Sequence, residues 1–284
     1  MNLGKFKIDA VDTGIFGLDG GSMFGVVPKA IWKKAYDEGD SENRIPLAAR
    51  LMLIRYDDKI ILVDTGNGTK YDKKFQKIFD IDRDNSDINV GLKKFGLQRE
   101  DITDVILTHL HFDHAGGATM PDSSGKPVPT FPNAKYYVQK DQLEWGKNPT
   151  LKDKGSFIKD DFMPLEADGM LETLDGDGDL FPGISMINVH GHTKAMQMVK
   201  VSDEGSSILY AADLCPTGTH IRLPFIMGYD NLPLTALEEK KKFWPQAADD
   251  NWIIFFEHDA KIQAGRIAYG KKDFELTEKI IISE

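Results

Sequence analysis

Residues 108–117, THLHFDHAGG, hold three histidines and one aspartate within six positions, namely His109, His111, Asp113 and His114. Imidazole and carboxylate groups suit a borderline divalent ion such as zinc, whereas an all-oxygen site would suit calcium or magnesium. Four candidate ligands are too many for one tetrahedral ion that must also bind a substrate. If the loop curves, two of them point one way and two the other, and this arrangement serves two neighbouring metal ions. The segment therefore predicts a dinuclear metal site.

Histidine and aspartate also stand at the ends of three later apolar runs. The segment HGHT (190–193) follows the first run, Asp213 follows the second, and EHD (257–259) follows the third. With the first cluster, four separate strand ends carry His or Asp, which favours one shared metal site over unrelated exposed turns. His190 and His192 lie two positions apart, so on a continuing strand they point the same way and spacing does not choose between them.

The composition restricts the class of protein. The chain of 284 residues is 41% hydrophobic and 28% charged, which is ordinary for a globular protein. Its 35 basic and 45 acidic residues give a net charge of 35 − 45 = −10, which disfavours a nucleic-acid partner. Cys215 is the single cysteine, so no intrachain disulfide is possible. The opening MNLGKFKIDAVD has no apolar run long enough for a signal peptide or a membrane span, so we expect a cytoplasmic protein without a membrane partner.

The elements that must position these residues are mostly short apolar strands bounded by turn residues. The predicted strands are 51–56, 60–64, 105–108, 135–139, 185–190, 197–201, 207–212 and 252–256. A helix is predicted at 88–95, where apolar residues recur at i, i+4 and i+7. A second is predicted at 235–247, where Thr235 and Glu238 form a capping box. The lysine run 240–242 inside it is interpreted as a solvated helix face.

Two predicted hairpins resemble each other. Residues 51–66 and 196–214 both contain a polar turn, and their second strands end in Asp64 and Asp213 respectively. Two similar halves, each a sheet with helices outside, favour a sandwich with a site where the strand ends meet. The alternative is that any two hairpins look alike.

The remaining stretches are predicted as loops. Residues 12–47 are glycine-rich and residues 120–184 are rich in Pro, Gly and Asp. Long loops of this kind are usually functional, and we expect both to rim the active site. No linker-like composition divides the chain, so residues 1–284 are predicted to form a single domain.

The order of the motifs resembles the metallo-β-lactamase superfamily over nearly the whole chain. The family pattern is HxHxDH, a GHT-type histidine, a bridging aspartate and a late histidine; here THLHFDH, GHT, AAD and EHD stand in that order. The resemblance implies an α/β, four-layer αββα sandwich with two metal ions. It assigns His109, His111 and His192 to one ion, Asp113, His114 and His258 to the other, and Asp213 to a bridging position. It places Asp64 and His190 beside these ligands, without binding a metal themselves.

Other segments look like the quorum-quenching N-acyl-homoserine lactonases and their arylesterase and organophosphate-hydrolase relatives. These segments are 19–29 (DGGSMFGVVPK), 212–217 (ADLCPT), 227–240 (MGYDNLPLTALEEK) and 256–259 (FEHD). Two positions depart from that group: Lys194-Ala195-Met196 replaces the Pro-Gly-His that often follows GHT, and Pro216 replaces a tyrosine. The residues expected to contact the substrate are therefore Tyr229 or His220, with an apolar wall from Phe24, Val27, Phe225 and Met227.

This resemblance implies a dinuclear hydrolase of lactones or carboxylic esters, in which a hydroxide shared by two ions attacks the carbonyl carbon. Asp213 or Asp113 is predicted to hold that hydroxide and then to protonate the leaving group. Zinc is the first expectation for both ions, with iron, manganese and cobalt as alternatives. The expected partner is a small ester or lactone, and the oligomeric state is open, a homodimer being one option.

Two alternative functions remain. The same two-metal site can hydrolyse phosphotriesters or phosphodiesters, which a panel of substrates would separate from ester hydrolysis. A metal-binding protein without turnover is the other alternative, and it is disfavoured because the full set of ligand types is present.

Overall fold

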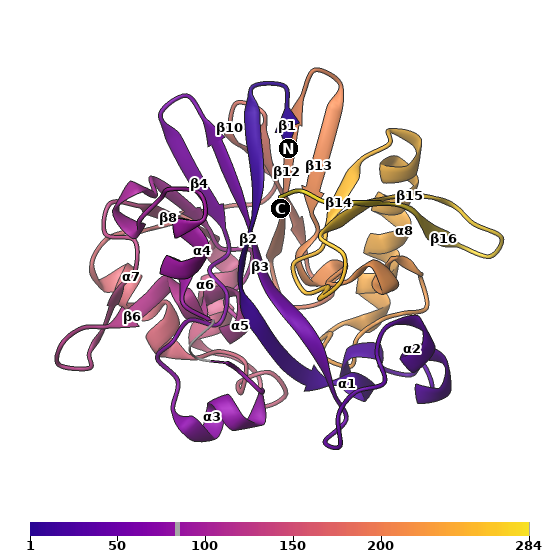
Figure 1. Ribbon diagram of the computed structural model, residues 1–284, viewed down its shortest axis with the longest axis horizontal. Helices are drawn as coiled ribbons and strands as arrows, with labels where there is room; N and C mark the ends of the chain where they lie inside the picture. The colour runs from indigo at the N-terminus through magenta and orange to yellow at the C-terminus, as the bar shows by residue number, and fades with distance from the viewer. Residues whose placement is uncertain (83–85, 284) are drawn as a thin grey trace.

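The computed structural model describes residues 1–82 and 86–283, and within them two large sheets form the centre of the molecule, flanked by helices (Figure 1). The first sheet has the order β1-β2-β3-β4-β5-β8-β9 and the second β10-β11-β12-β13-β14-β15-β16. The first comprises β1 (Asn2–Leu3), β2 (Phe6–Asp19), β3 (Arg44–Tyr56), β4 (Lys59–Val63), β5 (Asp104–Ile106), β8 (Lys135–Gln139) and β9 (Leu171–Leu174). The second comprises β10 (Gly178–Phe181), β11 (Ile184–Val189), β12 (Met196–Asp203), β13 (Ser206–Tyr210), β14 (Ile253–Phe255), β15 (Ala264–Tyr269) and β16 (Phe274–Ile280).

Helices cover the outer faces of both sheets. They are α1 (Gly20–Phe24), α2 (Lys29–Ala35), α3 (Lys73–Ile78), α4 (Ile88–Lys93), α5 (Phe112–Ala115), α6 (Lys140–Lys147), α7 (Met163–Ala167) and α8 (Pro233–Asp249). In Figure 1, α4, α6 and α7 lie on the side of the first sheet and α8 on the side of the second. A small hairpin of β6 (Thr119–Pro121) and β7 (Pro127–Pro129) lies outside both sheets.

Strand β3 shows why the protein forms four layers. Its side chains alternate between the two faces of the sheet, yet both sets are apolar and buried. Leu51 and Leu53 pack outward into a cluster that includes Leu92 of α4. Met52 and Ile54 pack inward into the core between the sheets, against residues of the second sheet. The order of layers is therefore helix, sheet, sheet, helix, as predicted.

The two hairpins do repeat one topology. In the first sheet β3 and β4 are antiparallel, and β5 then joins β4 in parallel. In the second sheet β12 and β13 are antiparallel, and β14 then joins β13 in parallel. Because parallel strands end at the same edge of a sheet, the segments that follow β4 and β5, and those that follow β13 and β14, are brought to one edge.

Helix α8 differs in two respects from its prediction. It begins at Pro233, with no side-chain cap, so Thr235 and Glu238 are already inside it. Lys240 is not solvated: it is only 2% exposed, whereas Lys241 and Lys242 are exposed. The reason is helical periodicity, since position 240 lies on the same buried stripe as positions 236, 243 and 247.

The two stretches predicted as loops are largely ordered elements. Residues 12–47 contain the end of β2, helices α1 and α2, and the start of β3, while residues 120–184 contain β7 to β10, α6 and α7. The pattern of β2 escaped detection because a register shift between Asp12 and Ile15 breaks its alternation.

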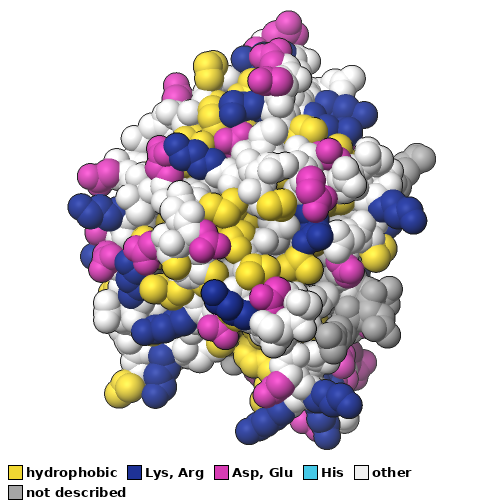
Figure 2. All heavy atoms as spheres, turned by 90° about the vertical axis from the view of Figure 1, so that its left-hand side faces the viewer, with side chains coloured by type: hydrophobic (Ala, Val, Ile, Leu, Met, Phe, Trp, Pro, Cys, Tyr) yellow, Lys and Arg dark blue, Asp and Glu magenta, His cyan; other side chains and the backbone are white. Residues whose placement is uncertain are grey.

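The surface is of mixed charge. On the face shown in Figure 2, acidic and basic side chains are interspersed around a patch of apolar ones, without a broad area of one sign. Within the residues that the structure describes, no helix has both the length and the apolar character needed to cross a bilayer.

Candidate metal centre

The structure brings the seven predicted ligands together at the edge where the strands end. Those of the first cluster follow β5 and lie on or next to α5; the others follow β11, β13 and β14. All seven are buried, with 0 to 7% of their surface exposed. They form two groups by proximity: His109, His111, His192 and Asp213 in one, and Asp113, His114 and His258 in the other.

Two glycines permit the close approach of the segments that carry the ligands. A Cβ on Gly117, behind α5, would lie 2.1 Å from the carbonyl oxygen of Thr65. A Cβ on Gly191 would lie 2.4 Å from the backbone of Ala236 in α8. Neither contact leaves room for a side chain, so the glycines of HAGG and GHT serve backbone packing next to the site.

Hydrogen bonds fix the tautomer of three ligand histidines. In each case the Nδ1 atom faces an oxygen acceptor, so Nδ1 carries the proton and the Nε2 lone pair is free to bind a metal. The acceptors are Asp64 Oδ2 for His114 at 2.8 Å, Asp230 Oδ1 for His192 at 2.9 Å and the Ala48 carbonyl for His258 at 2.8 Å.

The free ring nitrogens then point at one another. His114 Nε2 lies 3.0 Å from His258 Nε2, and in the neutral rings both atoms carry lone pairs. His111 Nδ1 lies 3.0 Å from His192 Nε2 and 3.1 Å from His109 Nε2. Lone pairs this close repel unless a proton or a metal cation lies between them. The donor set therefore fits divalent metal ions, for which imidazole nitrogens are good ligands.

Asp213 lies between the two groups. Its Oδ2 is 3.1 Å from His192 Nε2 and 3.6 Å from His114 Nε2, and its Oδ1 is 3.5 Å from His258 Nε2. Oδ1 is buried and has no hydrogen-bond partner among the described residues. Burial alone would raise the pKa of Asp213, but His192 and His114 hold it well below its usual range. An anionic carboxylate in this position suits a bridge between two cations.

The electric field at the centre also favours positive charge. Burial alone would lower the pKa of His114, but the carboxylates of Asp213, Asp64 and Asp113 raise it well above its usual value. Burial lowers the pKa of His109 and of His111 well below the usual range, which keeps these rings neutral and able to bind a metal. The negative carboxylates therefore favour a cation at the position where the neutral imidazole rings can bind it through their lone pairs.

The two residues predicted to lie beside the ligands behave differently. Asp64 accepts hydrogen bonds from the Thr108 backbone N–H at 2.7 Å and the Thr108 hydroxyl at 2.8 Å, besides its contact with His114. It thus supports the start of the ligand loop and one ligand. His190 is exposed, and its Nδ1 accepts from the backbone N–H of Ala195 at 3.1 Å. His190 does not belong to either ligand group, whereas His192 does.

Asp230 was not anticipated from the sequence. It is 5% exposed and holds His192 through Oδ1, while its Oδ2 accepts from the Met227 backbone N–H at 3.1 Å. Its separation of 38 residues from His192 gives no periodic signal. The one signal in the sequence was that Asp230 lies in a segment, 227–232, whose residue types are typical of a loop.

A cavity of about 230 Å³ opens over the ligands. His111, Asp113, His192, Asp213 and His258 contribute to its lining, together with Leu18, Met23, Phe79, Phe112, Lys152, Asp153, Gly155, Ser156, Met227 and Tyr229. Of the six side chains predicted to contact the substrate, Met227 and Tyr229 thus line it. Burial raises the pKa of Tyr229 to about 12, so the phenol is a neutral hydrogen-bond donor.

The other four predicted substrate contacts, Phe24, Val27, His220 and Phe225, do not line this cavity. Phe24 is fully buried and stacks between Trp32 and His220, with ring centroids 5.3 and 4.8 Å apart. Both His220 nitrogens are engaged, at 2.8 Å, with Thr217 Oγ1 and the Met23 carbonyl. Burial lowers the pKa of His220 to about 3, so the ring is neutral. These side chains pack behind the cavity wall because the apolar segments that carry them form a small core of their own.

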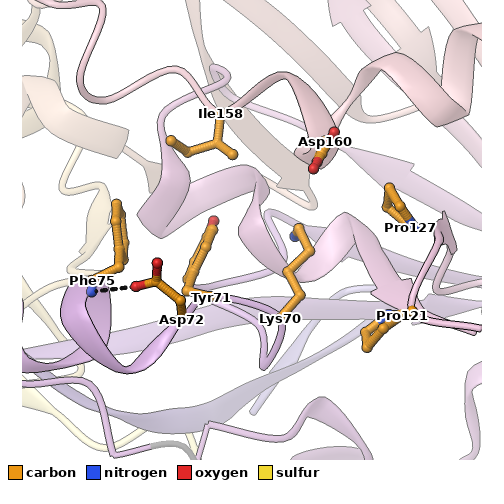
Figure 3. A pocket seen from close by; sticks show the side chains of 9 residues that line it. Lys70, Tyr71, Asp72, Phe75, Pro121, Pro127, Ile158 and Asp160 are labelled. Carbon is orange, nitrogen blue, oxygen red and sulfur yellow. Dashed lines mark hydrogen bonds between the residues drawn. The ribbon is translucent and has the colours of Figure 1, made fainter.

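A second cavity has a volume of about 290 Å³, and Figure 3 shows the side chains that line it. Its lining includes Lys70 and Tyr71 but none of the candidate ligands. Lys70 Nζ pairs with buried Asp161 at 2.7 Å, and the Tyr71 hydroxyl lies 2.8 Å from Asp161 Oδ2 and 3.2 Å from the Phe112 carbonyl. The contact with the Phe112 carbonyl joins Tyr71 to the first residue of α5, the helix that carries Asp113 and His114.

Comparisons with known proteins agree with this geometry. Residues 45–258 match the family model described as the Metallo-beta-lactamase superfamily. The N-acyl homoserine lactonase AiiA of Bacillus thuringiensis subsp. kurstaki is 29% identical over 223 residues, which cover 73% of this chain and 79% of that protein. A probable metal-dependent hydrolase from Staphylococcus aureus superposes with a TM-score of 0.87 at 28% identity, covering 99% of this chain and 100% of that one. The dizinc quorum-quenching lactonase AidC superposes with a TM-score of 0.81 over 99% of this chain and 96% of that one; at 23% identity this likeness shows the fold.

Proposed function

This chain belongs to the metallo-beta-lactamase superfamily and is a metal-dependent hydrolase, and from that premise we propose that it is a dinuclear enzyme that hydrolyses lactones and carboxylic esters. The observation that carries the proposal is the pair of ligand groups, each with converging imidazole nitrogens, that share the Asp213 carboxylate. The similarity to an N-acyl homoserine lactonase supports a lactone as the substrate.

The residues divide as the motif order suggests. His109, His111 and His192 would hold one ion, and Asp113, His114 and His258 the other, with Asp213 shared between them. Zinc is the expected metal, because each group combines imidazole with carboxylate. Two such ions, when bound, would lower the pKa of a water molecule and stabilise negative charge on the carbonyl oxygen and the leaving group.

The protein itself supplies orientation and proton transfer. Asp213 and Asp113 both line the cavity, so either carboxylate is placed to take a proton from the attacking water and to return it to the leaving oxygen. Tyr229, as a neutral donor in the same cavity, is placed to hydrogen-bond the carbonyl oxygen or the leaving group. Apolar side chains such as Leu18 and Met227 exclude bulk water from the reacting atoms.

The test combines metal analysis with a substrate panel. Protein purified without chelator is expected to contain two equivalents of metal and to open N-acyl-homoserine lactones or cleave aryl esters. A saturated content of one equivalent would contradict the dinuclear site. Turnover of phosphotriesters without any lactone or ester turnover would assign the protein to phosphotriester hydrolysis instead.

Three further hypotheses accompany the proposal. We retain a single domain over residues 1–284, because strands of both sheets contribute to one core. A cytoplasmic location stays a prediction, to be checked by cell fractionation. The oligomeric state stays open, with a homodimer as one option that light scattering would test.

A further inference from the structure

Lys240 of α8 is an unusual buried lysine. It is 2% exposed, and among the described residues its ammonium group contacts backbone carbonyls and forms no ion pair with a carboxylate. Lysine is almost never buried without a partner, because removing its charge from water is costly. Burial lowers its pKa, as this cost requires. A buried lysine without a carboxylate partner needs a structural explanation, and Lys240 has no role in the proposed hydrolysis.

The ammonium group is held by backbone carbonyls. Lys240 Nζ donates to the carbonyl oxygens of His220 and Phe225, both at 2.8 Å. One turn along the same face of α8, Trp244 Nε1 donates to the Ile221 carbonyl at 2.8 Å. Helix α8 therefore presents two side-chain donors, at i and i+4, to three carbonyls of residues 220–225, which we call the 220–225 turn.

The 220–225 turn supports one wall of the metal cavity. His220 Nε2 donates to the carbonyl of Met23, and Met23 lines the cavity. The turn leads directly into Met227 and Tyr229, which line the same wall. The Gly228 N–H donates to the Ser22 carbonyl at 2.8 Å, so the two wall segments are joined to each other as well.

The same connection reaches a candidate ligand. The Met227 N–H donates to Asp230, and Asp230 orients His192. The turn is thus continuous with both the apolar wall and the support of one ligand. We propose that Lys240 is a positioning residue that fixes the 220–225 turn, and through it the apolar wall of Met23 and Met227 that fits the acyl part of the substrate.

The proposal rests on the proposed function for its kinetic consequence. A displaced apolar wall weakens binding of a large acyl group more than it disturbs the reacting atoms, so KM should change more than kcat. Loss of one or two buried hydrogen bonds to carbonyls predicts a rise in KM of about fivefold to tenfold for decanoyl substrates. The kcat for an acetyl ester, which does not reach the wall, should stay within about twofold.

The central variant is Lys240→Met, which keeps the length of the side chain and removes its donors. Lys242→Met is the matched control, because it removes the same charge from an exposed position of the same helix. Leu143→Ala controls for general loss of stability, because Leu143 is buried in the core on the outer face of the first sheet. Only Lys240→Met should raise the KM for the decanoyl substrate relative to the acetyl one.

Hydrogen exchange tests the same wall without any substrate. In Lys240→Met, amides of residues 218–230 and 20–27 should exchange faster, while those of β4 and β5 keep their wild-type rates. Hydrogen exchange needs no turnover. It therefore tests the positioning role of Lys240 even if the proposed function is wrong. If Lys240→Met does not fold, Trp244→Phe removes one donor from the same face and should cause a smaller change of the same kind.

Two results would overturn the proposal. One is an unchanged ratio of decanoyl to acetyl KM in a folded Lys240→Met protein with wild-type exchange in residues 218–230. The other is an equal shift of this ratio in Leu143→Ala, which would assign the effect to stability in general.

Discussion

The support of His192 by Asp230 offers the sharpest test of the metal centre. The Asp230 carboxylate accepts from His192 Nδ1 at 2.9 Å and from the Met227 N–H at 3.1 Å. Asp230→Asn keeps the shape but replaces one acceptor oxygen by an NH₂ donor. Whichever way the amide is turned, one of the two N–H groups then faces a donor, so either the tautomer of His192 or the position of Met227 is disturbed.

The magnitude follows from the role of such partners in metal sites. Loss of a carboxylate that orients a ligating histidine typically lowers metal affinity by about 10- to 100-fold. This corresponds to about 1.4 to 2.7 kcal/mol of binding free energy. Only the ion held by His109, His111 and His192 should be affected, because Asp230 does not touch the ligands of the other group.

The assay is a chelator titration followed by elemental analysis. Wild-type protein should lose its two ions over a common range of chelator concentration, whereas Asp230→Asn should lose one equivalent at about 10- to 100-fold lower concentration. Glu239→Gln is the matched control: Glu239 accepts from the backbone N–H groups of His190 and Gly191 in the same segment but does not contact His192. Equal metal retention in Asp230→Asn, Glu239→Gln and wild type would refute the assigned role of Asp230.

Three other predictions concern individual residues of the centre. Asp213→Ala should lower metal content in both groups and abolish turnover, because Asp213 lies within 4 Å of ring nitrogens from each group; two retained ions with full turnover would contradict the bridge. His192→Ala should lose metal on elemental analysis while His190→Ala should not, because only His192 belongs to a ligand group; the reverse order would reassign the ligand. Tyr229→Phe should lower kcat/KM by about tenfold, the usual effect of one hydrogen bond to a charged group. Because the pKa of Tyr229 is about 12, above its ordinary value of 10, the phenol is protonated below that pH. The ratio of wild-type to Tyr229→Phe activity should therefore be the same at pH 7 and pH 9, and a ratio that falls between these pH values would show that the phenol ionises earlier.

The sequence by itself determined the residue types of the candidate metal site and the existence of eight of the strands. The candidate metal ligands are His and Asp at the ends of apolar runs, and this relation is local, because the change from apolar to polar residues that ends a strand is visible in the sequence itself. The eight predicted strands all exist for the same reason, since short apolar runs between turn residues have few other structures available. The repeated hairpins likewise predicted two halves, because each half repeats the same local pattern.

Only the tertiary structure decided which polar residues support the site and which apolar residues reach it. Asp230 and the Ala48 carbonyl find their histidines across 38 and 210 residues of sequence, and no spacing encodes such a contact. Phe24 and Phe225 have the composition of a pocket wall, but they pack behind it because burial against each other removes more apolar surface from water.

Lys240 shows most clearly the difference between what the sequence determines and what the tertiary structure determines. A run of three lysines in a helix favours solvent at every position, and by propensity alone all three should be exposed. Successive residues of a helix point about 100° apart, however, and the first lysine of this run falls on the buried stripe of positions 236, 243 and 247. In this protein that side holds the carbonyls of His220 and Phe225, which accept the ammonium hydrogens at 2.8 Å. The sequence determined that position 240 carries an ammonium group. The packing of α8 against residues 220–225 determined which carbonyl groups accept its hydrogen bonds.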